Sequence, residues 1–390
     1  MRVAYLSYDG ALDPLGSTQV VPYLEGLADT GVRFELITFE KPARLADAGR
    51  VSAMSARLTR AGIRWHALRY HQAPRVPATL FDIAAGAFRL RQLAKEHDID
   101  LFHCRGEITP IMARLSMLNG PLLLDMRGFF ADERVDAGSW KAGGLVDRAV
   151  RAMERRNLER ASRIVVLTTR GREVLRNRRV SLPIDVIPTC ADCRIFKPLD
   201  PPIPKVFDLV YFGSLGGWYM TEAMLDFVIE VKKHGEPLRV LFLTNNADEA
   251  TRKRLQGADV TVKSATPEEV PGWLAQCRAA FFFIRATDSK IASCPTKLAE
   301  ALAMGLPILT GPGVGDVDAI LRDEGVGVVL EEFSSSAFLR GWSSFKSLLQ
   351  ERNIQSRCRA VAQRRLSLET AIDQYRAAYD LMTAHPARRR

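Results

Sequence analysis

The sequence has no long uninterrupted run of apolar residues. Its densest apolar stretch, residues 279–284, is only as long as a buried strand, whereas a membrane-spanning helix needs about 18 such residues. The first segment turns polar at Asp9 and Asp13, too early for a signal peptide. We therefore expect a protein that does not span a membrane, is not secreted and is located in the cytoplasm.

Cysteine is also scarce, with six residues scattered through a chain of 390. This usage is typical of reduced thiols and excludes a disulfide framework. Cys190 and Cys193 have the spacing C-x2-C, but a structural zinc ion needs four ligands and the sequence offers no second pair of this kind. We expect no bound metal and no cofactor.

The composition, 47% hydrophobic and 26% charged residues, is that of a globular protein too long for one ordinary core. Two domains of about 180 residues each are the natural expectation. In the first half, short β-rich runs alternate with helical patterns such as residues 81–96 and 145–161. The expected strands are residues 3–8, 34–38, 63–70, 101–104, 122–126 and 164–167. This rhythm predicts a parallel sheet covered by helices on both faces.

Four prolines among residues 198–204 exclude regular structure and indicate a linker. Beyond the linker the alternation of strands and helices resumes. The expected strands are residues 209–212, 240–243, 260–262, 280–284, 307–309 and 326–330. The sequence thus predicts an α/β fold with two open parallel sheets, in which ligands bind at the carboxyl ends of the strands and in the cleft between the sheets.

The segment 290–305 has the features of an anion-binding helix start. It follows the expected strand 280–284, and Pro295 suits a first helical position because its missing N–H would have no partner there. The free N–H groups of that turn, the helix dipole and Lys297 together suit a diphosphate. Glu300, one turn later, is placed to accept hydrogen bonds from ribose hydroxyls. The alternative is an ordinary buried helix whose Lys and Glu are incidental.

Arg127 ends an expected strand of the first sheet, where ligands of such sheets bind. A guanidinium stays charged at neutral pH, so this residue can hold the charge of a phosphate or an acceptor but cannot act as a base. The neighbouring acids are Asp125, Asp132 and Glu133. They either take part in catalysis or simply pair with Arg127 and Arg134.

The net charge of +10 is concentrated in residues 141–180, which hold 12 Lys and Arg against four Asp and Glu. Arg148, Arg151 and Arg155 recur there at helical spacing. The commonest explanation is a solvated arginine face, and the sharper one is docking to anionic lipid headgroups, with Trp140 at the edge. Nucleic-acid binding would need interleaved aromatic residues, and residues 141–180 contain none. We expect no nucleic-acid partner.

Five segments resemble, in order, the motifs of retaining glycosyltransferase family 4, the group 1 glycosyltransferases. They are residues 8–20 (YDGALDPLGSTQV), 125–134 (DMRGFFADER), 187–198 (IPTCADCRIFKP), 213–220 (GSLGGWYM) and 295–308 (PTKLAEALAMGLPI). The resemblance implies the GT-B fold, with two Rossmann-like domains facing each other across a cleft. The implied divisions are an N-terminal acceptor domain (1–198), a C-terminal nucleotide-sugar domain (199–365), and a helix with a basic tail that crosses back to the first domain (366–390).

The family's activity is the metal-independent transfer of a sugar from a nucleotide diphosphate to a hydroxyl group, with retention of anomeric configuration. The resemblance implies a saccharide or lipid-linked acceptor and a place in bacterial surface glycan or glycolipid assembly, at the inner face of the cell membrane. A nucleotide-sugar epimerase of the same fold is the nearest alternative. A dinucleotide-dependent oxidoreductase is disfavoured, because neither half has G-x-G-x-x-G in its first strand-to-helix turn.

The resemblance also assigns residues to roles in this sequence. Catalysis falls to Arg127, Asp125, Lys290 and Lys297. Binding of the donor nucleotide falls to Gly16, Ser17, Gly213, Ser214, Thr296, Lys297 and Glu300. Binding of the acceptor falls to Asp9, Arg105 and Arg134. Gly16 precedes an expected helix over residues 17–28 and would let the backbone approach a phosphate closely, although a loop glycine is more often just a turn residue.

The sequence departs from the family pattern at two places. Ala292 stands where the family's Glu-x7-Glu has its first glutamate, so the sequence does not indicate the donor sugar. Residues 216–219 replace the Arg and Lys that many members place after the Gly-Ser-Leu turn. Neutralisation of the leaving diphosphate must then come from elsewhere, and the candidates are Lys290, Lys297 and Arg285.

Overall fold

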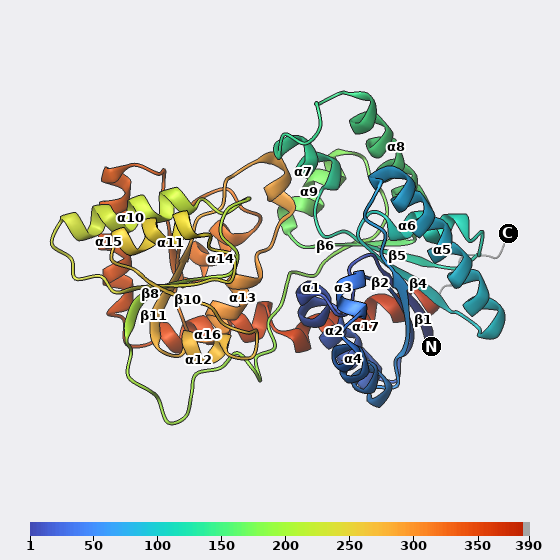
Figure 1. Ribbon diagram of the computed structural model, residues 1–390, viewed down its shortest axis with the longest axis horizontal. Coiled ribbons are helices and arrows are strands. Elements are labelled where there is room, and N and C mark those ends of the chain that lie inside the picture. Colours follow the sequence, from blue (N-terminus) through green and yellow to red (C-terminus); the bar gives the residue numbers. More distant parts are fainter. Residues whose placement is uncertain (385–390) are drawn as a thin grey trace. The chain divides into compact units, whose positions relative to one another are not determined.

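The computed structural model describes residues 1–384 and divides into two compact units (Figure 1). The first unit comprises Met1–Pro188 and the chain from Ala371 onward, and the second unit is Thr189–Thr370. The divisions thus follow Pro188 and Thr370, whereas the sequence placed them after residues 198 and 365. The expected basic tail, Arg388 to Arg390, lies outside the described residues.

The first unit is built on a parallel sheet of seven strands. The strands are β1 (Arg2–Ser7), β2 (Arg33–Glu40), β3 (Arg64–Arg69), β4 (Leu101–Arg105), β5 (Leu122–Asp125), β6 (Arg163–Val166) and β7 (Ile184–Val186), in the order β3-β2-β1-β4-β5-β6-β7. Every strand expected in this half is present, and β7 is an addition. Strands β4 and β5 are buried along their whole length, as in a sheet covered on both faces.

Helices lie on both faces of this sheet. They are α1 (Pro14–Gln19), α2 (Val21–Asp29), α3 (Pro42–Leu45), α4 (Ala48–Arg60), α5 (Arg75–Glu96), α6 (Thr109–Leu115), α7 (Phe130–Asp136), α8 (Leu145–Arg160) and α9 (Thr169–Asn177). The prediction of one helix over residues 17–28 was wrong, because Pro22 lacks the N–H that would continue the ladder and the chain breaks at Val20. Gly16 therefore lies inside α1 and does not precede it.

The second unit is built on a parallel sheet of six strands. The strands are β8 (Phe207–Phe212), β9 (Val240–Leu243), β10 (Thr261–Lys263), β11 (Cys277–Phe282), β12 (Ile308–Thr310) and β13 (Gly327–Val329), in the order β10-β9-β8-β11-β12-β13. All strands expected here are present, and residues 198–204 contain neither helix nor strand, as predicted.

The helices of this unit are α10 (Thr221–Lys233), α11 (Glu249–Gly257), α12 (Val270–Leu274), α13 (Thr296–Ala303), α14 (Val317–Asp323), α15 (Ser335–Leu349) and α16 (Ile354–Arg365), with a 3-10 turn, η1 (Asp288–Ala292). Pro295 precedes α13 as its N-cap, one position earlier than predicted. The core is rich in aromatic side chains. Phe227 packs edge-on against both Phe283 and Phe338, with ring centroids 5.8 and 5.6 Å away.

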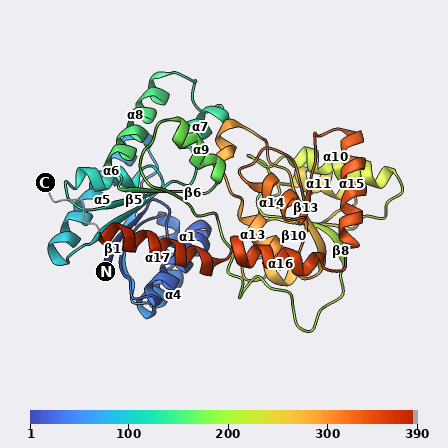
Figure 2. The ribbon, with the colours of Figure 1, turned by 180° about the vertical axis from the view of Figure 1, so that it is seen from behind.

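The last helix, α17 (Leu368–Ala384), returns the chain to the first unit (Figure 2). The ring of Tyr375 meets that of Tyr23 at 6.0 Å, and the hydroxyl of Tyr379 lies 2.6 Å from Nδ1 of His103. The helical pattern of residues 361–382 predicts one helix that makes this return; the return is confirmed, but the segment is not one helix. Helix α16 ends where the main chain around Ser367 pairs with Ala191.

None of the helices within residues 1–384 combines the length and the apolar character that crossing a membrane requires. The six cysteines, all within the described residues, form no disulfide, and five of them are buried.

Candidate functional site

In the second unit, two neighbouring strands bring the predicted donor residues together. Strand β11 lies next to β8, so the turn after β8 and the segment after β11 meet at the carboxyl edge of the sheet. The turn contains Gly213 and Ser214, and the segment runs through η1 into α13, which begins at Thr296. No side chain caps the N-terminus of α13. An uncapped helix start at this edge suits an anion.

Lys297 is the most closely held cation of this edge. Its side chain is only 6% exposed, and Nζ lies 3.9 Å from the centre of the Tyr219 ring. Within residues 1–384 it forms no salt bridge. Gly213 has a φ of +119°, and a Cβ atom there would lie 2.6 Å from Lys297 Nζ. Glycine at 213 therefore leaves room for the lysine.

Lys290 and Arg285 lie in the segment that follows β11, at the same edge of the sheet. Lys290 is 6% exposed, with Nζ 4.0 Å from the centre of the Trp218 ring. The guanidinium carbon of Arg285 lies 5.2 Å from that ring. All three cations proposed from the sequence thus gather beside the turn that lacks the family's Arg and Lys, each over the face of an aromatic ring.

Glu300 lies one turn into α13, where it is partly buried. Burial raises the pKa of its carboxyl to about 7, and the charge of Lys297 opposes this rise. The group therefore changes its charge near neutral pH. Its position in the same helix as Thr296 and Lys297 agrees with the prediction that these residues act together.

In the first unit, the strand ends bring together Asp125, Arg127 and Arg105. Asp125, at the end of β5, is 1% exposed; one carboxylate oxygen lies 3.4 Å from Nη1 of Arg127 and the other 3.5 Å from Nη1 of Arg105. Burial raises the pKa of a carboxyl, but Arg127, His103 and Arg105 outweigh it and hold the pKa of Asp125 below its ordinary value. Asp9 joins the group, 4.0 Å from Arg105 Nε.

His103 belongs to this cluster although the sequence did not indicate it. Its Nε2 lies 3.5 Å from Asp125, and burial lowers its pKa, so the ring is neutral at physiological pH. The available signal was the placement of His103 and Arg105 at alternate positions of β4, which puts both on one face of the sheet. With Tyr5 and Tyr23, these residues line a small cavity of about 10 Å³.

Other residues assigned from the sequence lie apart from these contacts. Asp132 pairs with Arg151 and Arg178, at 2.8 and 2.9 Å, and not with Arg127 or Arg134. Arg134 lies exposed on α7 with its guanidinium over the ring of Phe130. The expected pairing of Asp132 with Arg127 or Arg134 was wrong, because its partners are Arg151 in α8 and Arg178 at the end of α9.

Gly16 and Ser17 have partners within their own segment. A Cβ atom at Gly16 would lie 1.9 Å from the carbonyl oxygen of Gly10, so close packing of α1 already requires glycine. The hydroxyl of Ser17 donates to the carbonyl of Pro14 at 3.1 Å. Their assignment to the donor stays a prediction.

Asp125 should be the residue of the first unit on which stability depends most. Its replacement by alanine leaves the buried Arg105 and the partly buried Arg127 without this carboxylate, at a cost of about 3–5 kcal/mol or roughly 5–10 °C in melting temperature at pH 7. Because the folded-state pKa is lowered, this contribution is present at neutral pH and is lost as pH falls below about 4. Thermal melts should show the loss, whereas Asp373→Ala, at an exposed position on α17, should melt like the wild type. Equal melting temperatures for both variants would contradict this account of Asp125.

The first half of the chain matches a known protein family. Residues 16–190 match the model of the glycosyl transferase 4-like domain. None of the curated protein sequences matches the chain.

Solved structures match nearly the whole chain. Sucrose-phosphate synthase from Thermosynechococcus elongatus is 15% identical, with a TM-score of 0.71 over 98% of this chain and 99% of that one. Anabaena HepE in complex with UDP-glucose is 13% identical, with a TM-score of 0.68 over 98% of this chain and 100% of that one. The lipopolysaccharide outer core galactosyltransferase WaaB is 11% identical, with a TM-score of 0.65 over 97% of this chain and 99% of that one. These likenesses show a shared fold.

The family match and the fold agree with the resemblance drawn from the motifs. The family match favours sugar transfer over the alternatives of an epimerase, which has the same fold, and a nucleic-acid-binding protein. The chain matches the glycosyl transferase 4-like domain over residues 16–190, has the GT-B fold of two Rossmann-like sheets, and is a glycosyltransferase.

Proposed function

We propose that the enzyme moves a sugar from a nucleoside diphosphate to a hydroxyl group of a saccharide or lipid-linked acceptor, with retention of configuration. The observation that carries the proposal is the set of cations around α13. Lys297 and Lys290 are both 6% exposed; Lys297 lies in the first turn of the uncapped helix α13, beside Gly213, and Lys290 lies in η1, which precedes that helix. Buried positive charge of this kind suits the diphosphate that leaves when the sugar is transferred.

In this mechanism the protein contributes mainly positioning and charge. The N–H groups at the start of α13 and the two lysines stabilise the negative charge that develops on the leaving diphosphate. The leaving phosphate oxygen takes the proton of the acceptor hydroxyl on the same face, which gives retention. No metal or cofactor is required in this scheme. Among the described residues, no cluster of His, Cys, Asp and Glu is arranged to hold a metal ion.

The first unit supplies the acceptor site in this proposal. Arg127 and Arg105 present positive charge, and Asp125 keeps both guanidiniums in place at the ends of β4 and β5. Asp9, half-exposed beside Arg105, can accept a hydrogen bond from a sugar hydroxyl. The structure of HepE with UDP-glucose makes uridine nucleotides the first donors to test. By analogy with WaaB, we place the reaction in surface glycan assembly.

Nucleoside diphosphates should stabilise the protein. At about 100 times its dissociation constant, the correct one of UDP, GDP and ADP adds roughly 2.7 kcal/mol, which a thermal-shift assay detects. Lys290→Ala/Lys297→Ala should lose both this shift and sugar transfer, while Lys233→Ala, at an exposed position on α10, should keep them. Turnover that survives in the double variant would show that other groups stabilise the leaving diphosphate.

Glu300 should make nucleotide binding depend on pH. Its pKa is raised to about 7 by burial, with Lys297 opposing, and the ionised carboxylate is the stronger acceptor for ribose hydroxyls. Affinity for the nucleoside diphosphate should therefore increase, about tenfold, as pH rises from about 6 to 8. Calorimetric titrations of wild type and Glu300→Gln at several pH values test this. An identical pH profile in both proteins would remove Glu300 from the ribose site.

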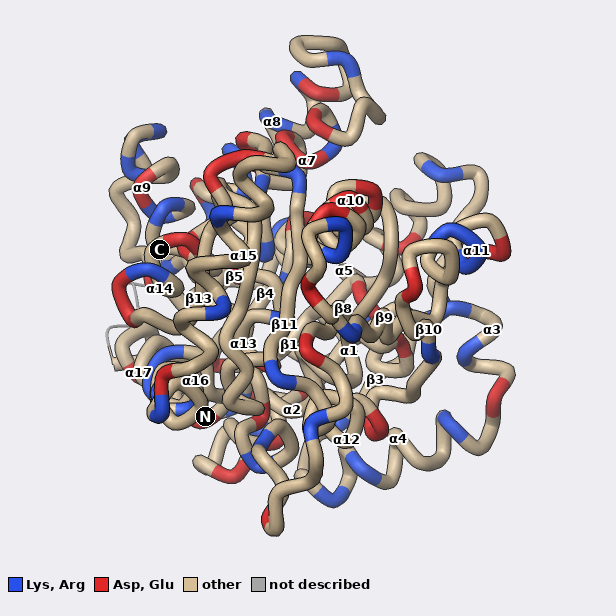
Figure 3. The backbone as a smooth tube through the Cα atoms, turned by 90° about the vertical axis from the view of Figure 1, so that its left-hand side faces the viewer, with Lys and Arg blue, Asp and Glu red and all other residues tan. Residues whose placement is uncertain are grey.

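We further propose that the enzyme attaches to an anionic membrane surface through the helices of the first unit. Helix α8 has exposed arginines at 148, 155 and 156, and Leu145 at its start is 87% exposed. Figure 3 shows that Lys and Arg recur along this helix. Arg151, named with them from the sequence, is bound to Asp147 and Asp132, each at 2.8 Å, and is not part of this surface.

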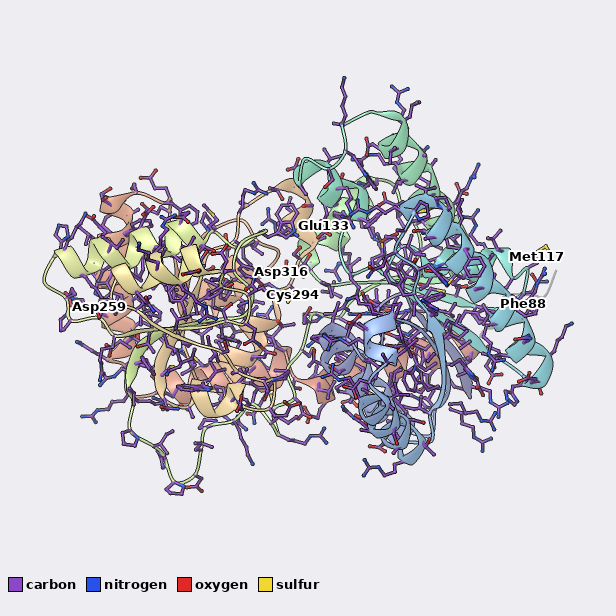
Figure 4. The ribbon with its side chains drawn as sticks, viewed as in Figure 1. Phe88, Met117, Glu133, Asp259, Cys294 and Asp316 are labelled. Carbon is purple, nitrogen blue, oxygen red and sulfur yellow. The ribbon has the colours of Figure 1, made fainter. Side chains whose placement is uncertain are left out.

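Helix α5 and the end of α6 add an apolar face to the same unit. The exposed large side chains there are Val76, Leu80, Phe81, Phe88, Leu115 and Met117. Phe88 and Met117 both lie at the outer edge of the unit (Figure 4). Exposed apolar side chains together with exposed arginines in one unit are typical of proteins that bind an anionic bilayer.

Replacing the three exposed arginines should therefore release the protein from anionic vesicles. At about 1 kcal/mol for each basic residue, Arg148→Ala/Arg155→Ala/Arg156→Ala should bind vesicles containing phosphatidylglycerol roughly 100-fold more weakly. Liposome sedimentation measures this, with Lys253→Ala/Arg352→Ala, at exposed positions of the second unit, as the matched control. Equal binding of all three proteins, or none to anionic vesicles by the wild type, would rule out the attachment.

A further inference from the structure

Trp218 and Tyr219 occupy the place where many relatives carry charged side chains, and the structure shows what lies against them. The ring of Trp218 has Lys290 Nζ at 4.0 Å and the Arg285 guanidinium carbon at 5.2 Å. The ring of Tyr219 has Lys297 Nζ at 3.9 Å. Every cation that we assign to the diphosphate therefore contacts one of two consecutive aromatic residues.

The main chain fixes these rings in place. Gly216 and Gly217 have φ values of +75° and +62°, in the left-handed region where a larger side chain is strained. The turn that they form brings Trp218 and Tyr219 back against the end of β11. There the Arg285 amide donates to the Trp218 carbonyl at 2.9 Å, and Tyr219 pairs with Ile284 in a single antiparallel bridge.

A ring and a carboxylate hold a cation in different ways. A carboxylate neutralises the charge and competes with an incoming phosphate for the same donors. The face of an aromatic ring attracts the cation through its quadrupole and leaves the net charge unchanged. Within residues 1–384, neither Lys297 nor Arg285 has a salt bridge, so the rings are their principal support.

We propose that Trp218 and Tyr219 are positioning residues of the diphosphate site. They hold Lys290, Arg285 and Lys297 close to the start of α13, and they leave the full charge of Arg285 and Lys297 available to the ligand. The inference rests on the proposed function, since it assumes that the ligand is a nucleoside diphosphate. It explains how this chain dispenses with the Arg and Lys of the Gly-Ser-Leu turn.

The test compares two ligands that differ only in the diphosphate. UDP, GDP and ADP are first titrated calorimetrically against the wild type, and the one that binds best is then compared with its nucleoside. Trp218→Leu and Tyr219→Leu should each weaken diphosphate binding roughly tenfold, while the affinity for the nucleoside stays unchanged. Trp218→Phe and Tyr219→Phe keep a ring face and should bind both ligands within about twofold of the wild type.

The experiment includes a folding control and a second measurement. Trp273→Leu removes an indole from α12, elsewhere in the same unit, and should leave diphosphate binding unchanged. If the leucine variants do not fold, the tryptophan fluorescence of the wild type tests the inference instead. It should change on addition of the diphosphate, because the ligand draws Lys290 from the Trp218 ring, and the change should be absent in Trp218→Phe/Lys290→Ala.

The outcomes separate the inference from the proposed function. If the wild type binds none of the three diphosphates, the proposed function fails. If it binds one and the leucine variants bind it equally well, only the inference is overturned. A loss of affinity that is the same for diphosphate and nucleoside also overturns the inference, because it would show a general structural role.

Discussion

The central physical constraint in this protein is that Lys297 and Arg285 must be held at one edge of a sheet without a carboxylate partner. Like charges repel, and each lysine pays a desolvation cost when it is buried. At the start of α13 the chain meets this constraint with ring faces, a glycine beside Lys297 and an uncapped helix end. The second sheet builds this edge, because the parallel pairing of β8 and β11 places the turn after β8 next to the segment that leads into α13.

The first unit solves a similar problem in the opposite way. There the arginines at the strand ends are held by a buried carboxylate, Asp125, which stays ionised because they surround it. His103 lies 3.5 Å from the carboxylate oxygen of Asp125 that Arg105 also approaches, and its other ring nitrogen lies 2.6 Å from the hydroxyl of Tyr379 in α17. The returning C-terminal helix thus supports this cluster through a short chain of buried polar contacts. A cation that is paired with a carboxylate is suited to orienting a ligand through hydrogen bonds. A cation on a ring face keeps its net charge and is suited to stabilising a negatively charged ligand.

Much of the fold could be predicted from the sequence because parallel strands are short, apolar and separated by amphipathic helices. The pattern failed where a single residue decides the outcome. Pro22 breaks the helix expected over residues 17–28, and the main-chain pairing of Ser367 with Ala191 divides the last helix. Strand β7 escaped prediction because only its first residue is fully buried, which leaves little apolar signal.

The candidate site, like the fold, could be predicted only in part from the sequence. The motif in α13 indicated Lys297 and Glu300, because helix spacing alone puts them near each other. The roles of His103, Trp218 and Tyr219 depend on contacts between segments distant in sequence, which no local pattern contains. The sequence shows that no Arg or Lys directly follows Gly213-Ser214-Leu215. It does not show that the aromatic rings that stand there hold cations from other segments.

The most direct test of the central claim is a ³¹P NMR titration of the nucleoside diphosphate that binds the protein. We predict that the resonances of both phosphorus nuclei shift and broaden on binding to the wild type, because the diphosphate lies against Lys290, Lys297 and the start of α13. Lys290→Ala/Lys297→Ala should leave both resonances near their free positions. Equal shifts with the double variant and with the wild type would contradict the account.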